Sequence, residues 1–371
     1  MMSTTPAASN PPVVWLVSET FEPRGSSGYT LRLARHLSEF GFHPVIICES
    51  DQYIPTKLKP KLDIRVVKKM RSRLFGPAAL RRLVQQTSRP PDLVHSQRHG
   101  LERVGDDLAD AFDVPHLLTL HNYVENRTRL SVRPPDLSAL IAVSPSIQRD
   151  LLEKESLLES FVHLIPSGVD IPEPLRVPPP RDPEKIPVVG TASVLEQSKG
   201  IVYFLMAAEL ILSSGHDVEF VIAGSGPEEE TLRMAAQHLD IANRVTFAPH
   251  VTSFMPVIET FDVFVLPSLE QGLGTVMLEA MAVGKPVVAT KVGGVADFFI
   301  DGEHAIIVDK ENHVVLSDKI EMLLDFPDKA RKLAMNGQNF VRERFHTERM
   351  VADTATLYRQ ILQSLPIPLR G

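Results

Sequence analysis

The 371-residue chain has one cysteine, one tryptophan and no long apolar run. Its single cysteine, Cys48, cannot form a disulfide within the chain. Cys48 ends the apolar run 45–48, which predicts a buried strand, so the thiol is expected to pack in a core. This cysteine usage fits a reducing, cytoplasmic compartment. No apolar stretch approaches the roughly 20 residues that cross a bilayer, so we expect no transmembrane helix.

The start of the chain, residues 1–12, lacks the basic and apolar regions of a signal peptide, and we expect it to be a disordered tail. The rest has the composition of a globular protein, with 43% hydrophobic residues and a mean hydropathy of −0.01. A single hydrophobic core rarely serves more than about 250–300 residues, so the length predicts two domains.

The net charge of −7 hides a strongly basic stretch at residues 57–89, which holds eleven Lys/Arg and one acidic residue, Asp63. Apolar residues recur near helical spacing in this stretch: Met70, Leu74, Phe75, Leu80 and Leu83. The combination predicts an amphipathic surface element. This element is either a solvated face or a surface that docks on an anionic membrane, peripherally on the inner face of that membrane. Nucleic acid is not expected as a partner, because no aromatic interleaving or recognised binding motif accompanies the charge.

The first half of the chain opens with a strand–turn–helix–strand pattern. An apolar strand at 13–17 precedes a glycine-rich loop at 22–28, a helix pattern at 29–40 and a strand that begins at Val45. Because this loop follows the carboxyl end of a strand, its backbone amides are expected beside an anion. Further short apolar runs predict buried parallel strands at 93–94, 117–120, 140–143 and 164–165.

Seven prolines within residues 172–187 predict an extended linker, since proline disfavours helices and central strands. A second series of strands is predicted after it, at 188–191, 219–223, 244–247, 263–266 and 287–289. Three helix patterns close the chain, at 314–324, 329–344 and 348–362. The predicted organisation is a tail (1–12), an N-terminal domain (13–172), a linker (173–187), a C-terminal domain (188–345) and a final segment (346–371).

Residues 261–297 hold the most informative pattern, which is two strand–loop–helix units in a row. An apolar run ends in the glycine-containing loop 272–274, and a helix pattern starts at Thr275 with Glu279 one turn in. A second apolar strand ends at the glycine pair 293–294. Such loops form the ligand-binding edge of a doubly wound sheet, where backbone amides and helix N-termini receive phosphate. A carboxylate beside them suits ribose hydroxyls, so the pattern predicts nucleotide binding.

This pattern resembles the donor-binding core of the family 4 retaining glycosyltransferases. Their signature is an acidic residue, a short Gly-x-Gly loop and a glutamate eight positions after the first acid. Residues 271–275 and 278–282 fall on this signature, and further family motifs follow the same order at 224–227, 243–247, 293–295 and 301–302. The resemblance implies the GT-B fold, an α/β architecture of two facing Rossmann-like doubly wound domains. It also implies that the last helix, within 346–371, crosses back to the N-terminal domain.

The resemblance assigns roles to individual residues. Lys199 would pair with the donor diphosphate, Glu279 would accept hydrogen bonds from both ribose hydroxyls, and His121 would contact the donor sugar or the acceptor. Gln271 stands where the family has its first glutamate, and Val194 stands where it commonly has an arginine. The expected catalytic group is therefore His121, Lys199, Gln271 and Glu279. The expected donor-binding positions are Gly25, Val194, Gly224, Gly226, Glu270, Gly272, Leu273, Gly274, Thr275 and Gly294.

The reaction implied by the resemblance is the retaining transfer of a sugar from a nucleotide diphosphate sugar to a hydroxyl of a glycan, lipid or small-molecule acceptor. No metal site is expected, because the 13 histidines lack paired ligand spacing, and no cofactor is expected beyond the nucleotide sugar as co-substrate. One alternative is a catalytically impaired homologue with a binding or regulatory role, which Val194 and Gln271 favour. Another is a different enzyme on the same fold, such as an epimerase or a glycogen-type phosphorylase, although no pyridoxal phosphate lysine context is visible.

Overall fold

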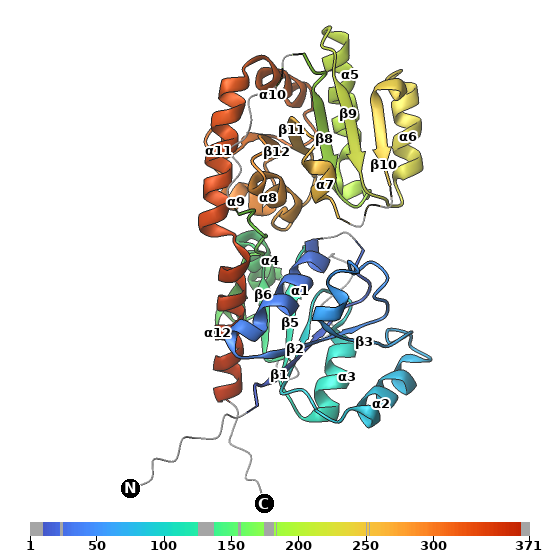
Figure 1. The fold of residues 1–371 in the computed structure, drawn as a ribbon, viewed down its shortest axis with the longest axis vertical. Helices are drawn as coiled ribbons and strands as arrows, with labels where there is room; N and C mark the ends of the chain where they lie inside the picture. The colour runs from blue at the N-terminus through green and yellow to red at the C-terminus, as the bar shows by residue number, and fades with distance from the viewer. Residues whose placement is uncertain are drawn as a thin grey trace, which may run out of the picture.

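The computed structural model describes residues 10–22, 25–124, 137–154, 157–173, 182, 184–249, 251 and 253–364. Within these residues the chain forms two stacked α/β domains, each built on one parallel sheet (Figure 1). Every strand pair in both sheets is parallel. This architecture confirms the predicted fold class of two Rossmann-like domains.

The N-terminal sheet has seven strands in the order β3-β2-β1-β4-β5-β6-β7. Its strands are β1 (Val13–Val17), β2 (His43–Cys48), β3 (Asp63–Val66), β4 (Leu93–Ser96), β5 (His116–Leu120), β6 (Ala139–Ala142) and β7 (Val162–Leu164). Its helices are α1 (Gly25–His36), α2 (Gly76–Gln86), α3 (Glu102–Phe112) and α4 (Pro145–Lys154). The sequence predicted all of these strands except β3, which is a partly exposed edge strand inside the basic stretch.

Side chains of β1 point alternately into two hydrophobic cores on opposite faces of this sheet. Leu16 packs in one core with side chains of α1, and Trp15 packs in the other with side chains of α2 and α3. Burial on both faces explains why the strand is continuously apolar. Cys48 lies in the α1 core, as predicted, and burial raises the pKa of its thiol to about 12.

The C-terminal sheet has six strands in the order β10-β9-β8-β11-β12-β13. Its strands are β8 (Val188–Ala192), β9 (Glu219–Ala223), β10 (Val245–Ala248), β11 (Val263–Leu266), β12 (Val287–Thr290) and β13 (Ile306–Val308). Its helices are α5 (Ile201–Ser213), α6 (Glu229–His238), α7 (Met255–Ile258), α8 (Thr275–Ala282), α9 (Gly293–Phe298), α10 (His313–Asp325) and α11 (Pro327–Arg344). The sequence missed only β13 among these strands, because it is a three-residue edge strand.

The second half of the predicted glycine-rich loop, residues 25–28, is the first turn of a helix, while residues 23–24 lie outside the described residues. Helix α1 begins at Gly25, four residues before the expected start at Tyr29. Glycine and serine are poor helix formers, so their composition hid this turn in the sequence. Their small size matters in space, because a Cβ on Gly25 would lie 3.0 Å from the Oγ1 atom of Thr275 in the other domain.

The final helix, α12 (Thr347–Ser364), crosses back to the N-terminal domain and packs beside α1 (Figure 1). A β-bridge between Val169 and His346 lies where the chain passes between the domains. Farther along α12, the Tyr358 hydroxyl lies 2.6 Å from His95 Nδ1 inside the N-terminal core. Most of the predicted tail and linker lies outside the described residues.

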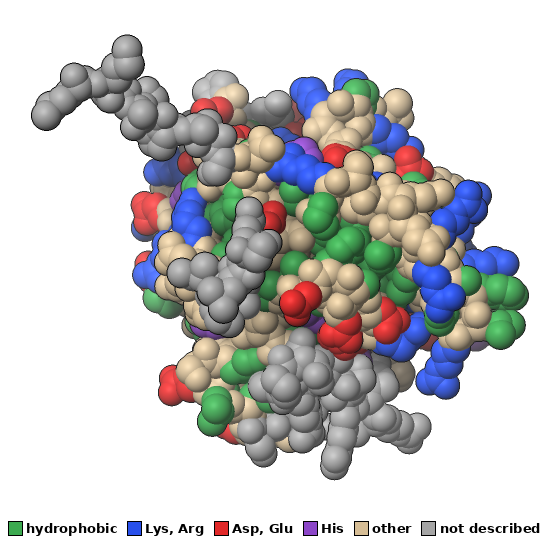
Figure 2. Space-filling view, turned by 90° about the horizontal axis from the view of Figure 1, so that it is seen from below, with side chains coloured by type: hydrophobic (Ala, Val, Ile, Leu, Met, Phe, Trp, Pro, Cys, Tyr) green, Lys and Arg blue, Asp and Glu red, His purple; other side chains and the backbone are tan. Residues whose placement is uncertain are grey.

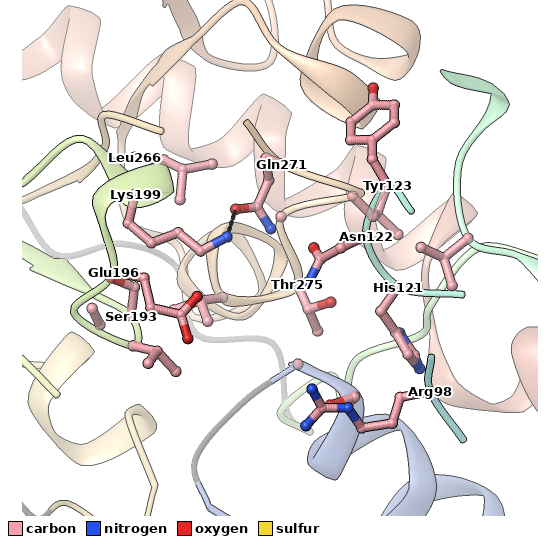
Figure 3. A pocket seen from close by; sticks show the side chains of 18 of the residues that line it. Arg98, His121, Asn122, Tyr123, Ser193, Glu196, Lys199, Leu266, Gln271 and Thr275 are labelled. Carbon is pink, nitrogen blue, oxygen red and sulfur yellow. Dashed lines mark hydrogen bonds between the residues drawn. The ribbon is translucent and has the colours of Figure 1, made fainter. Parts of the chain in front are cut away.

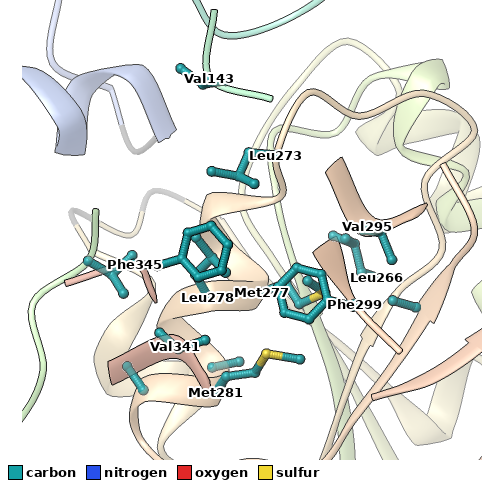
Figure 4. Packing of buried hydrophobic residues seen from close by; sticks show 14 of the residues in the cluster. Val143, Leu266, Leu273, Met277, Leu278, Met281, Val295, Phe299, Val341 and Phe345 are labelled. Atoms are coloured by element: carbon teal, nitrogen blue, oxygen red, sulfur yellow. The ribbon is translucent and has the colours of Figure 1, made fainter. Parts of the chain in front are cut away.

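One hydrophobic core runs across the boundary between the domains (Figure 4). It contains Val143 from the N-terminal domain together with Leu273 and Leu278 from the C-terminal domain. Beside it, Asp297 of α9 accepts hydrogen bonds from the backbone amide of Ser146 and from the Arg149 side chain, both at 2.7 Å. The domains are therefore held together on the α4–α9 side.

The basic stretch 57–89 does not form the single amphipathic element that the sequence predicted. It contains β3 at the sheet edge, a turn region and α2. Met70 and Leu80 are buried in the core with Trp15, whereas Leu74 and Phe75 are 78% and 54% exposed. Helical spacing was a wrong interpretation here, because the apolar residues belong to different elements and point to different surroundings.

Candidate functional site

A cavity of about 500 Å³ lies between the two domains (Figure 3). It forms where the carboxyl ends of strands from both sheets face each other. It is lined by Gly25, Ser26, Arg98, His99, His121, Asn122, Tyr123, Val143, Ala192, Ser193, Val194, Glu196, Lys199, Phe254, Leu266, Gln271, Leu273, Gly274, Thr275 and Val276. Such a cleft is the usual ligand site of doubly wound sheets.

Two helix N-termini meet at this cavity. Helix α1 begins at Gly25 and α8 begins at Thr275, and both residues line the cavity wall. Gly274, with a positive φ of 85°, forms the turn that leads into α8. The first amides of a helix have no partner within the helix, and its N-terminus carries a partial positive charge. Their convergence makes this part of the cavity suited to an anion.

Lys199 and Gln271 both line the C-terminal side of the cavity and contact each other there (Figure 3). The Lys199 Nζ atom donates a hydrogen bond of 3.0 Å to Gln271 Oε1, and the Ser268 hydroxyl donates to the same oxygen at 3.3 Å. The amide oxygen of Gln271 is thus engaged, and its NH2 group is the part left to meet a ligand. Since glutamine is neutral, residue 271 does not offset the lysine charge as a glutamate would.

His121 follows β5, as predicted, and lies on the N-terminal side of the cavity. Its Nε2 atom is buried and has no hydrogen-bond partner within the described structure. Its ring lies edge-on to Tyr29, with centroids 4.9 Å apart. Burial, helped by the charge of Arg98, lowers the pKa of His121 to about 3. The imidazole is therefore neutral near pH 7 and can hydrogen-bond a ligand without contributing charge.

Glu279 does not line the main cavity. It lies in a smaller cavity of about 160 Å³, which shares Gly25, Phe254 and Val276 with the larger one. Its Oε1 atom accepts a hydrogen bond of 2.6 Å from the Arg32 guanidinium of α1, in the other domain. The two cavities are neighbours that share part of their lining, with Lys199 lining the larger one and Glu279 the smaller one.

Several predicted donor-binding glycines do not line the cavity but let neighbouring backbone segments approach each other closely. A Cβ on Gly224 would lie 1.9 Å from the carbonyl oxygen of Ser193, and Gly226 lies similarly close to the backbone of residue 195. A Cβ on Gly272 would lie 1.9 Å from the carbonyl oxygen of His121, so this glycine lets the two domains approach. The amide of Gly294 donates to the Gly272 carbonyl at 2.6 Å and is not available to a ligand.

The two departures from the family pattern have different placements. Val194 lines the cavity and presents an apolar side chain where an arginine was expected. Glu270 is exposed and does not line either cavity, so it does not take the place of the acid missing at Gln271. The remaining predicted positions, Leu273 and Thr275, line the larger cavity.

Sequence reasoning missed several cavity residues, of which Arg98 and Glu196 carry full charges of opposite sign. Arg98 follows β4, and its Nη1 atom donates a hydrogen bond of 2.7 Å to Glu19. Asn122 and Tyr123 follow His121, and the Ser193 hydroxyl is buried without a partner in the described structure. Their position just after the carboxyl ends of β4, β5 and β8 was the available signal.

Among the described residues, no group of three or more His, Cys, Asp or Glu side chains is arranged to hold a metal ion. The same part of the chain contains no helix with the length and apolarity to cross a bilayer.

Comparisons with known proteins identify the family to which both halves of the chain belong. Residues 23–173 match the family model "Glycosyltransferase Family 4", and residues 177–340 match "Glycosyl transferases group 1". The chain is similar to an alpha-D-kanosaminyltransferase of Streptomyces kanamyceticus, with 31% identity over 177 residues, which are 47% of this chain and 46% of that protein. It thus spans about half the length of this relative. An alpha-maltose-1-phosphate synthase of Mycolicibacterium smegmatis is 26% identical over 312 residues, covering 72% of this chain and 79% of the synthase.

A solved structure shares the fold over nearly the whole chain. The crystal structure of Anabaena HepE in complex with UDP and glucose has a TM-score of 0.79 and 19% identity, and it covers 94% of this chain and 100% of HepE. The two domain matches, the parallel sheets that face each other and the crossover helix agree with one another. The chain belongs to the family 4 glycosyltransferases, which have the GT-B fold.

Proposed function

We propose that this protein transfers a sugar, with retention, from a nucleotide diphosphate sugar to a hydroxyl acceptor. The observation that carries the proposal is the convergence of two helix N-termini and Lys199 on one cavity, next to a second cavity lined by Glu279. An anion-binding region beside a ribose-binding carboxylate suits a nucleotide with a diphosphate. The crystal structure of HepE in complex with UDP and glucose supports a uridine nucleotide as the first donor to test.

The donor would lie along the C-terminal wall of the cleft. Its diphosphate would lie against Lys199 and the start of α8, and its ribose would lie against Glu279. The acceptor would approach from the N-terminal wall, where Arg98, His121 and Tyr123 line the cavity. This arrangement brings the acceptor hydroxyl and the anomeric carbon together in one enclosed space.

Catalysis would rest on stabilising the leaving group. The bond between the anomeric carbon and the diphosphate breaks, the acceptor oxygen bonds to that carbon, and the hydroxyl proton passes to the departing phosphate. Negative charge grows on the diphosphate, where the Lys199 ammonium and the helix amides are fixed in advance. His121, held neutral, would orient a sugar or acceptor hydroxyl by a hydrogen bond rather than by charge.

An impaired homologue with a binding or regulatory role remains the alternative, because Val194 and Gln271 remove two charged groups. Arg98 weakens the case for this alternative, since it brings a second cation to the same cavity from the other domain. Arg98 is also paired with Glu19, so its charge is partly offset. Turnover of the donor separates the two possibilities.

The test is a screen for donor hydrolysis. Thermal shift with UDP, GDP and ADP, and with their sugar conjugates, should select one nucleotide, and slow release of that nucleotide from its conjugate would show turnover. Glu279→Gln should abolish most of this release, while Glu270→Gln, a matched change at an exposed neighbour, should leave it unchanged. A thermal shift without turnover would favour the regulatory role, and no shift with any nucleotide would contradict the proposal.

We further propose that the edge of the N-terminal domain docks on an anionic membrane. Figure 2 shows Lys and Arg side chains along one side of this domain, with hydrophobic side chains protruding beside them. Leu74 and Phe75 are the strongly exposed apolar residues of the basic stretch 57–89, and Lys69 Nζ lies 4.7 Å from the centre of the Phe75 ring. Each basic residue near an anionic surface contributes about 1 kcal/mol, and the apolar pair would enter the interface.

Liposome co-sedimentation tests this surface. Binding should require anionic lipid, fall as salt rises, and weaken in the double variant Leu74→Ser, Phe75→Ser. Leu158→Ser, a similarly exposed leucine outside the basic stretch, is the control and should bind as the wild type does. Equal binding to neutral and anionic vesicles would contradict membrane docking, and a lipid-linked acceptor would lose its structural support.

A further inference from the structure

Arg32 occupies an unusual position between the two domains. It lies on α1, and its Nη2 atom donates a hydrogen bond of 2.6 Å to Oε1 of Glu279 on α8. Its Nε atom lies 3.7 Å from a carboxylate oxygen of Asp170, close to the point where the chain passes between the domains. The Arg32 side chain is 9% exposed and that of Glu279 is 16% exposed. This ion pair is therefore largely shielded from water.

The guanidinium is held between two carboxylates, those of Glu279 and Asp170. Its Nη1 atom is buried without a hydrogen-bond partner in the described structure, and a Cβ on Gly28 would lie only 2.9 Å from it. Arginine keeps its positive charge at any ordinary pH. A cation fixed in this way fixes the carboxylate that it binds.

Only one oxygen of Glu279 is engaged by the protein. Oε1 binds Arg32, while Oε2 has no hydrogen-bond partner among the described residues. Glu279 faces the smaller cavity, so Oε2 is the acceptor that a ligand can reach there. The same cavity shares Gly25 and Val276 with the lining of the larger one.

We propose that Arg32 is a positioning residue that holds Glu279 ready for the ribose of the nucleotide. The inference rests on the proposed function, because it concerns the same donor site. Arg32 orients the carboxylate so that Oε2 faces the ribose hydroxyls. The nucleotide site of the C-terminal domain is thus completed by a side chain of the N-terminal domain.

The pair stays intact when the nucleotide binds. A ribose diol is neutral, and its hydrogen bonds to a carboxylate are weaker than those from a guanidinium. Displacing Arg32 would leave a largely buried charge next to Glu279 without its partner, which is costly. Ribose therefore adds to the pair through Oε2 and does not replace Arg32.

This arrangement couples nucleotide affinity to the relative position of the domains. Asp170, which binds Arg32 and Arg35, also accepts a hydrogen bond of 2.8 Å from Thr347 at the start of α12. A movement of α1 away from α8 would release Glu279, and nucleotide bound to Glu279 would in turn favour the closed arrangement.

The test compares Arg32→Gln with Arg35→Gln. Arg35 binds the same Asp170 carboxylate at 3.0 Å and also lies on α1, but it does not contact Glu279. Isothermal titration with the nucleoside diphosphate that the wild type binds should show a loss of about 10- to 100-fold in affinity for Arg32→Gln. Arg35→Gln should change the affinity by less than about threefold, since surface ion pairs contribute little.

Further measurements separate positioning from a general structural effect. Inorganic pyrophosphate has no ribose, so its affinity should be the same in Arg32→Gln and the wild type. The double variant Arg32→Gln, Glu279→Gln should lose no more affinity than Glu279→Gln alone, because both changes act through one contact. Arg32→Lys, which keeps the charge, should recover part of the loss and replaces the glutamine variant if that variant does not fold.

The outcomes are distinct. Nucleotide affinity in Arg32→Gln that equals or exceeds that of a binding wild type would overturn the role of Arg32 and leave the proposed function standing. A parallel loss of pyrophosphate affinity would also overturn it, since the effect would not pass through the ribose. Failure of the wild type to bind any nucleoside diphosphate would overturn the proposed function and this role together.

Discussion

His95 should make the N-terminal domain sensitive to acid. Its side chain is fully buried between α12 and β5, with Nδ1 2.6 Å from the Tyr358 hydroxyl and Nε2 2.7 Å from the Thr119 hydroxyl. Burial lowers the pKa of His95 to about 3, and the neighbouring His116 and His121 act in the same direction. The folded protein therefore keeps this imidazole neutral at pH values where the unfolded chain protonates it.

The sign and the size follow from linkage. Below the unfolded pKa of about 6.5, His95 is protonated in the unfolded chain but stays neutral in the folded state. The free energy of unfolding therefore falls as the pH falls, and this decrease levels off near pH 3. With a folded pKa of about 3, His95 alone lowers the free energy of unfolding by about 2 kcal/mol between pH 7 and pH 5.

The chain offers a specific probe for this effect. Trp15 is its only tryptophan and lies in the N-terminal core, so its fluorescence in urea reports the unfolding of that domain. His95→Gln should be less stable than the wild type at pH 7, because two buried hydrogen bonds change. Its stability should fall less between pH 7 and pH 5, so the gap to the wild type should narrow by about 2 kcal/mol.

A matched control and a clear contradiction are available. His238, at the end of α6, is exposed, so His238→Gln should follow the wild type at each pH. A gap between His95→Gln and the wild type that stays constant from pH 7 to pH 5 would refute the reasoning, because it would mean that the folded state accepts the proton.

Two further changes test the cleft. Lys199→Met removes the ammonium that binds Gln271. It should lower the affinity for a nucleoside diphosphate by about 10- to 100-fold in isothermal titration and leave the affinity for the bare nucleoside unchanged. An equal loss of affinity for both would place the lysine away from the phosphates. Gly272→Ala adds a Cβ 1.9 Å from the His121 carbonyl oxygen and should keep the domains apart. Small-angle scattering should then show a more open particle, and donor hydrolysis should be lost. Scattering and hydrolysis equal to those of the wild type would contradict this, because the backbone would have moved to accept the Cβ.

Much of the fold could be predicted from the sequence, because buried parallel strands appear in it as short apolar runs. Strands with both faces covered, such as β1, gave the clearest signal. The edge strands β3 and β13 escaped, because they are short and partly exposed. The start of α1 escaped for a different reason, since its glycines favour a loop. Only the close approach of Gly25 to Thr275 and of Gly28 to Arg32 explains their presence in a helix.

The site could be predicted only where its residues follow a local motif. Lys199, Gln271 and Thr275 line the cavity, and the family spacing was the signal that singled them out. Arg32 could not be found in this way, since its partner Glu279 lies 247 residues away. Arg98 had a weak signal at the end of β4, and no local pattern tied it to the other domain.

The most direct test of the donor site is a crystal structure with the nucleoside diphosphate that gives the largest thermal shift. We expect the phosphates within hydrogen-bond distance of Lys199 Nζ and the first amides of α8, and the ribose hydroxyls on Oε2 of Glu279. A nucleotide bound outside the two cavities lined by Lys199 and Glu279, or with its phosphates turned away from Lys199, would contradict the proposed function.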